Sequence, residues 1–135
     1  MKATITSLIF LLLSLTVSSQ TYKYIGIEEG LSNQKIYKIQ KDARGYMWFL
    51  THVGIDQYNG KEIKHYKLRE GNRELDPLLN INWTFLDKTG TLLVTGKQGR
   101  IFRYDSGHDR FVQIYSMYNY WNKDYHAFVR YCYVD

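Results

Sequence analysis

Short apolar or alternating runs follow one another along residues 36–115, and glycine, asparagine or aspartate separates them. Each run has the length of about five residues that is usual for a strand. No long stretch after residue 20 sustains apolar side chains at the spacing of a helix. The pattern therefore predicts an all-β fold of short strands joined by tight turns.

The dipeptide Asn59-Gly60 is the sharpest turn signal in the chain. Asparagine and glycine accept the positive φ angles that a two-residue hairpin turn needs. We therefore expect residues 55–58 to pair antiparallel with residues 62–66.

The strand pattern repeats at an offset of 45 residues, so that the segment 36–42 aligns with the segment 81–87. The pairs at this offset include Gly45 with Gly90, Trp48 with Leu93, and Gly54 with Gly99. After a shift of one residue, Tyr58 and Asn59 align with Tyr104 and Asp105. Such self-similarity indicates a repeat architecture.

Each repeat contains four predicted strands. They cover residues 36–41, 46–50, 54–58 and 62–66 in the first repeat, and 81–86, 91–95, 100–104 and 111–115 in the second. A four-stranded unit that recurs every ~40–50 residues is typical of a β-propeller blade. The sequence therefore predicts blade one over residues 36–66 and blade two over residues 81–115, each with antiparallel strands.

Both ends of the chain resemble parts of a blade. Residues 129–135 restate the first strand of the repeat, with Asp135 at the position of Asp42, and we expect them to start a third blade. We interpret residues 21–27 as a fourth strand that completes the last blade of a ring, and an ordinary edge strand is the alternative. The expected domain is thus a partial propeller over residues 20–135 that forms an incomplete ring.

The first residues differ from the rest. Lys2 precedes a mostly apolar run over residues 5–17, and Val17 and Ser19 lie where a cleavage site needs small residues. This layout is typical of a secretory signal peptide, here over residues 1–19. An uncleaved anchor is the alternative, although a membrane-spanning helix takes about 20 apolar residues. We therefore expect the chain to be exported.

Charge and cysteine content narrow the classes of function. The chain has 18 basic against 13 acidic residues. The basic residues are dispersed, so no nucleic-acid partner is expected. Cys132 is the only cysteine, which excludes an internal disulfide or a cysteine metal cluster. The four histidines are widely spaced, and we expect neither a metal site nor a cofactor.

The residue types that recur have structural explanations. Trp48 is predicted in mid-strand, where an apolar side chain would fill the gap between neighbouring blades. Gly54 and Gly99 start the third strands, where a side chain would crowd its neighbour. Tight turns are expected where an aspartate can bond its own backbone and a glycine accepts positive φ, at Asp42 with Gly45 and at Asp87 with Gly90.

A longer motif runs through residues 30–59. It reads Gly-Leu-Ser, an apolar strand, Asp-x-x-Gly-x-x-Trp-x-x-Thr-x-x-Gly, and then a tyrosine with an asparagine. Its members are Gly30, Leu31, Ser32, Asp42, Gly45, Trp48, Thr51, Gly54, Tyr58 and Asn59. This segment resembles the first repeat of the two-component regulator propellers, and it departs from their pattern at Leu50, where glycine is usual. The second repeat keeps Asp87, Gly90, Gly99, Tyr104 and Asp105.

The resemblance implies the periplasmic sensor region of a hybrid two-component sensor histidine kinase that is anchored in the inner membrane. Such a region binds a small-molecule ligand, often an oligosaccharide, and acts through the remaining blades and signalling domains on transcription. The sequence has no phospho-accepting histidine motif and no ATP-binding glycine box, so we do not expect this chain to be an enzyme. The alternatives are the start of an exported propeller lyase or hydrolase, and a stand-alone carbohydrate-binding propeller.

The stretch 117–126 holds more aromatic residues than strands and turns require. Aromatic rings can stack on the C–H faces of sugars, while amide and charged groups bond hydroxyl groups. The candidate ligand-binding residues are Tyr118, Tyr120, Trp121, Lys123, Asp124 and Tyr125. Arg69, in the expected loop 67–80, is a further candidate on the same face of the ring. In the alternative interpretation, the aromatic side chains of 117–126 only cover the core.

Overall fold

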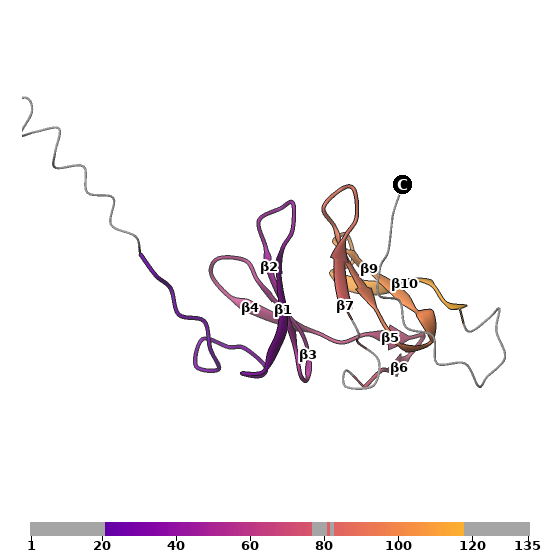
Figure 1. The fold of residues 1–135 in the computed structure, drawn as a ribbon, viewed down its shortest axis with the longest axis horizontal. Helices are drawn as coiled ribbons and strands as arrows, with labels where there is room; N and C mark the ends of the chain where they lie inside the picture. The colour runs from indigo at the N-terminus through magenta and orange to yellow at the C-terminus, as the bar shows by residue number, and fades with distance from the viewer. Residues whose placement is uncertain (1–20, 77–80, 82, 118–135) are drawn as a thin grey trace, which may run out of the picture.

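The computed structural model describes residues 21–76, 81 and 83–117. The expected signal peptide over 1–19, the third-blade strand over 129–135 and the six ligand candidates of 118–125 lie outside these residues. The described chain contains two four-stranded antiparallel sheets and a short two-stranded one (Figure 1). The predicted all-β fold of four-stranded blades is confirmed.

The first sheet is a simple meander. Its strands are β1 (Ile36–Lys41), β2 (Met47–Thr51), β3 (Gly54–Tyr58) and β4 (Ile63–Tyr66), and neighbours in the chain are neighbours in the sheet. The sheet forms because each connection is short enough for consecutive strands to pair antiparallel.

The turn between β3 and β4 differs from the expected one by one position. Ile55 pairs with Tyr66 and Tyr58 with Ile63, so the antiparallel pairing is confirmed. The backbone N–H of Asn59 donates to the carbonyl oxygen of Glu62 at 3.3 Å, so Gly60 and Lys61 are the central residues of the turn. The Asn59 side-chain oxygen accepts from the N–H groups of Lys61 and Glu62, which holds Asn59 in front of the turn.

The second sheet repeats the same order. It consists of β7 (Trp83–Leu86), β8 (Leu92–Thr95), β9 (Ile101–Asp105) and β10 (Arg110–Tyr115). The 3₁₀ turn η1 (Lys97–Gly99) joins β8 to β9, and Gln98 has a φ of 61° there. Within the described residues, the observed ends of the strands lie within two residues of the expected ones.

A small hairpin stands in the stretch that was expected to be a loop. Strands β5 (Arg69–Glu70) and β6 (Arg73–Glu74) flank Gly71, whose φ is +58°. Leu68 and Leu75 close the hairpin with a 2.9 Å hydrogen bond, and both side chains are buried. Strands of two charged residues carry no alternating pattern, so the expectation of a loop was wrong over these four residues.

Residues 21–27 form no strand in the structure. Instead the chain makes a turn, in which the N–H of Leu31 donates to the carbonyl oxygen of Gly26 at 2.9 Å and Glu29 accepts from the N–H of Gly26. A strand needs a hydrogen-bonding neighbour, and residues 21–27 are paired with no strand among the described residues. Its closing role therefore stays a prediction.

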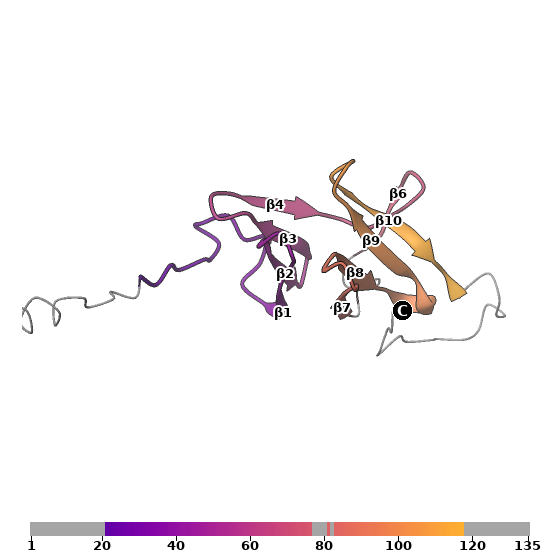
Figure 2. The ribbon, with the colours of Figure 1, turned by 90° about the horizontal axis from the view of Figure 1, so that it is seen from above.

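The two sheets pack against each other with β1 next to β7 (Figure 2). The core between them is apolar and is formed by Trp48, Leu50, Ile55, Tyr66, Leu68, Leu75, Leu92, Val94, Phe102, Tyr104 and Phe111. Burying one large apolar side chain contributes about 1.5–3 kcal/mol relative to leaving it exposed. The contact between the blades is thus a hydrophobic core.

The turns at one end of the sheets also touch. The backbone N–H of Ala43, in the β1–β2 turn, donates to the carbonyl oxygen of Gly90, in the β7–β8 turn, at 3.1 Å. A Cβ atom added at Gly90 would lie 2.4 Å from the Cβ of Ala43. Glycine at this position lets the two backbones approach, and its φ of +74° favours glycine as well.

Candidate functional site

Four aromatic side chains meet where the two sheets face each other. The Trp48 ring lies 5.5 Å from the ring of Tyr66, 4.7 Å from that of Tyr104 and 5.7 Å from that of Phe111. Its contacts with Tyr104 and Phe111 are edge-to-face, and only 1% of Trp48 is exposed. Trp48 from the first sheet is therefore packed against the aromatic residues of the second.

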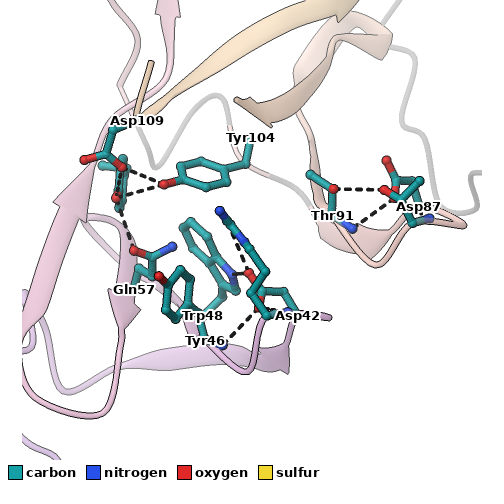
Figure 3. Close-up of polar contacts among 11 residues, drawn as sticks. Asp42, Tyr46, Trp48, Gln57, Asp87, Thr91, Tyr104 and Asp109 are labelled. Carbon is teal, nitrogen blue, oxygen red and sulfur yellow. Dashed lines mark hydrogen bonds and ion pairs between the residues drawn. The ribbon is translucent and has the colours of Figure 1, made fainter. Parts of the chain in front are cut away.

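The carboxylate of Asp109 joins the same two sheets (Figure 3). Asp109 precedes β10, and its Oδ1 accepts hydrogen bonds of 2.6 Å from the hydroxyl groups of Tyr66 and Tyr104. Its Oδ2 accepts from Lys64 at 3.1 Å. Tyr66 and Lys64 belong to β4, so one carboxylate of the second sheet bonds two side chains of the first.

These contacts shift the acidity of the partners. The hydrogen bonds from Tyr104 and then from Tyr66 lower the pKa of Asp109 to about 2. Burial and the bond to Asp109 raise the pKa of Tyr66. Asp109 therefore stays charged, and Tyr66 stays protonated, over the whole physiological range.

Asp42 fixes the turn before β2 and the orientation of Trp48. Its Oδ1 accepts from the backbone N–H groups of Arg44 and Tyr46, and its Oδ2 accepts from the indole N–H of Trp48 at 3.0 Å (Figure 3). Gly45 completes the turn with a φ of +87°. The aspartate thus satisfies the one polar group that the buried indole carries.

Asp87 builds the corresponding turn of the second sheet. Its Oδ1 accepts from the N–H groups of Thr89 and Thr91, as Asp42 does one repeat earlier (Figure 3). Its Oδ2 accepts from Arg103 Nε at 2.9 Å, because Leu93 stands where the first repeat has its tryptophan. Burial raises the pKa of Asp87, but the hydrogen bonds outweigh it and lower the pKa to about 2.

The segment Gly30-Leu31-Ser32 is attached to the first sheet. Leu31 is 4% exposed. The backbone N–H and the hydroxyl group of Ser32 both donate to Asp56 Oδ2 at 2.8 Å, and its Oγ lies 3.0 Å from Thr51 Oγ1. Ser32 near the start of the sequence motif and Thr51 further along it are therefore in contact in space.

His65 also binds Asp56, through Nδ1 and Oδ1 at 2.8 Å. A serine nucleophile needs its hydroxyl group next to the histidine that removes its proton. Here the fully buried Asp56 lies between Ser32 and His65. The carboxylate of Asp56 therefore separates Ser32 from His65, and the three side chains form a structural hydrogen-bond network.

Residues 30–52 match the family model of the two component regulator propeller. This segment is a two-component regulator propeller repeat. The matched residues begin with the Gly-Leu-Ser segment, include Asp42 and Trp48, and end just after Thr51. They therefore contain both partners of the contact between Ser32 and Thr51. In a search of curated proteins, no protein matched the chain.

Next to this propeller repeat, a pocket of about 720 Å³ lies between β4, the β5–β6 hairpin and β10, and we name it the β4–β10 pocket. Its volume is within the range of about 300–1,000 Å³ that is usual for small-molecule sites. Arg69, a candidate from the sequence, lines the pocket together with Tyr66, Asn72, Asp109 and Arg110. The pocket therefore has contributions from both sheets.

Most charges of the pocket have partners. Lys67 binds Glu74 at 2.5 Å, Glu70 binds Arg100 at 3.4 Å, and Asp109 binds Lys64. The guanidinium groups of Arg69 and Arg110 have no hydrogen-bond or ion-pair partner among the described residues. The charged groups of the pocket that remain available to a ligand are therefore the two positive guanidinium groups of Arg69 and Arg110.

Sequence reasoning did not single out the groups that join the sheets, namely Tyr66, Asp109 and Phe111. Asp109 is the last residue of the connection between β9 and β10, and its φ of 49° is rare for a residue other than glycine. The positive φ at a residue other than glycine identifies Asp109 as unusual, but this signal can be read only from the backbone structure.

The described residues contain no group of three histidine, cysteine, aspartate or glutamate side chains arranged to hold a metal ion. The same part of the chain has no helix with the length and apolar character needed to cross a membrane. The described residues thus form the β4–β10 pocket, which is lined by charged and amide side chains and lies beside the packed aromatic cluster around Trp48.

Proposed function

We propose that this chain forms the first part of a ligand-sensing propeller in a hybrid two-component sensor histidine kinase. The observation that carries the proposal is the match of residues 30–52 to the two component regulator propeller, in a chain that folds into two four-stranded sheets. In this proposal the chain is exported to the periplasm and binds a small molecule, and further blades and signalling domains relay the binding to transcription.

A binding function, and not catalysis, agrees with the polar groups of the described residues. The carboxylates of Asp42, Asp56 and Asp87 are all engaged in holding turns or loops in place. Asp109 has a lowered pKa, whereas a general acid at neutral pH needs a raised one. The free donors of the β4–β10 pocket suit the recognition of a polar ligand, for which an oligosaccharide is our proposal.

Ligand binding is tested with the full chain by calorimetry against a panel of oligosaccharides. We expect at least one of them to bind and to raise the midpoint of thermal unfolding, because a ligand that binds only the folded state stabilises it. If no member of the panel binds or stabilises the chain, the proposed sensing of a glycan is wrong.

Export is tested by fusing alkaline phosphatase, which is active only outside the bacterial cytoplasm, behind residue 117. We expect an active fusion, and an inactive one when Leu12→Arg interrupts the apolar run of residues 5–17. Activity that is low in both fusions would contradict a periplasmic location.

A further inference from the structure

We propose that the β4–β10 pocket binds the carboxylate-bearing sugar of an acidic oligosaccharide. This inference rests on the proposed sensing function and names the class of ligand and the place where it binds. The carboxylate would lie between the guanidinium groups of Arg69 and Arg110, and the sugar hydroxyl groups next to Asn72.

The charge of the pocket selects an anion. Three acidic groups line it, and each is already occupied: Glu70 by Arg100, Glu74 by Lys67, and Asp109 by two tyrosines and Lys64. Arg69 on β5 and Arg110 on β10 are exposed and have no partner among the described residues. Guanidinium groups bind carboxylates through two parallel hydrogen bonds, which makes arginine the preferred residue for this task.

The remaining lining suits a sugar more than a simple anion. Asn72 lies in the hairpin turn and supplies an amide donor and acceptor. Val112, which is 37% exposed, supplies apolar surface, against which the C–H groups of a sugar ring can pack. The volume of about 720 Å³ exceeds what a lone carboxylate ion needs.

The position of the pocket links a ligand to both blades. Tyr66 belongs to the first sheet and Asp109 to the second, and both line the pocket while they bond each other. The two arginines come from the connection between the sheets and from β10. A ligand that bridges them would therefore stabilise one relative position of the sheets.

The test is calorimetric titration of the full chain with short oligomers of galacturonate, glucuronate and mannuronate, and with neutral oligomers of galactose, glucose and mannose. We expect an acidic oligomer to bind more tightly than its neutral counterpart. Arg69→Ala and Arg110→Ala should each weaken this binding by about ten- to hundredfold, because each removes a hydrogen bond between charged groups.

Arg73→Ala is the matched control, since Arg73 is an exposed arginine of the same hairpin that does not line the pocket. Its affinity for the acidic oligomer should equal that of the unchanged chain. Far-UV circular dichroism of all three variants verifies that they fold, as expected for exposed side chains.

The outcomes separate the two proposals. Acidic oligomers that fail to bind, or that bind equally to the Arg69→Ala and Arg110→Ala variants, overturn the pocket assignment. If neutral oligomers bind in the same experiment, the sensing function stands and only the pocket assignment is wrong. If neither class binds, both proposals are wrong.

Discussion

Trp48 is the residue on which the contact between the two sheets depends most. It is nearly fully buried, it touches three other aromatic rings, and its indole N–H is bonded to Asp42. Trp48 thus contacts the other sheet through its ring and bonds the turn of its own blade through its N–H group. It therefore couples the local structure of one blade to the packing between the two blades.

Trp48→Ala is expected to lower the free energy of unfolding by about 3–5 kcal/mol, the range measured for buried large aromatic residues. Trp83→Ala is the control, since the Trp83 side chain is 43% exposed and its loss should cost far less. Urea unfolding followed by far-UV circular dichroism measures both. Equal losses for the two variants would contradict the assignment of Trp48 to the core.

Asp109→Asn is expected to destabilise the chain at neutral pH by about 1–2 kcal/mol, because it removes the charge that accepts the bonds of Tyr66, Tyr104 and Lys64. Half of this side chain is exposed, which places the effect at the lower end of values for charged groups. The measurement is urea unfolding at pH 7, and an unchanged midpoint would contradict the role of Asp109 as a link between the sheets.

The same carboxylate predicts a dependence on pH. The folded-state pKa of Asp109 is about 2, below the ordinary value of 3.8. Its contribution is therefore complete only above about pH 5 and is lost as the pH falls through the folded-state pKa. Unfolding midpoints of the unchanged chain should therefore fall more steeply between pH 4 and pH 2 than those of Asp109→Asn. Asp87 contributes equally to both proteins, so it does not affect the comparison. Parallel curves would show that Asp109 makes no contribution of this kind.

At the scale of elements, the sequence was sufficient for the strands and insufficient for the contacts between sheets. Alternation of side chains, aspartates before turns and a repeat at a fixed offset are local signals, and they predict two four-stranded sheets. The β5–β6 hairpin has no such signal, because its strands are two residues long and charged.

The candidate site shows the same limit. Arg69 could be singled out as a polar residue in a connection, but its proximity to Arg110 could not, since 41 positions separate the two in the sequence. Their shared pocket follows from the packing of β5 next to β10. Pairing between distant elements depends on tertiary contacts, which no local pattern encodes.

The contact between the β1–β2 and β7–β8 turns can be tested with two glycines. Gly90→Ala introduces both an unfavourable φ of +74° and a clash with Ala43, whereas Gly45→Ala introduces only an unfavourable φ of +87°. The backbone term costs about 1–2 kcal/mol in either variant. We expect thermal unfolding to show the larger loss for Gly90→Ala. A larger loss for Gly45→Ala would contradict the close approach of the two turns.

At the scale of the whole molecule, apolar side chains remain exposed on both sheets. Tyr37 and Ile39 of β1 are 49% and 52% exposed, and Ile114 of β10 is 55% exposed. Tyr37 and Ile39 lie on the same face of β1, and contiguous exposed apolar surface marks sites of association. In the proposed function these faces are the places where further blades pack.

We expect the chain to self-associate as its concentration rises, and we expect Ile39→Thr to reduce this association without loss of the β1 strand. Threonine keeps the branching at Cβ that favours strands and lowers the apolar area. Sedimentation equilibrium measures the effect. The variant Ile114→Thr on β10 extends the test to the second sheet, and association that neither variant changes would exclude these faces as the cause.

The two sheets pack as adjacent blades around Trp48. Nuclear Overhauser effects between assigned aromatic protons test this directly, with the contact between Trp48 and Tyr66 inside the first sheet as an internal reference. We predict cross-peaks from the Trp48 indole to the ring protons of Tyr104 and Phe111, whose ring centres lie 4.7 and 5.7 Å away. A spectrum with the reference cross-peak but without those to Tyr104 and Phe111 would contradict the packing of the two blades.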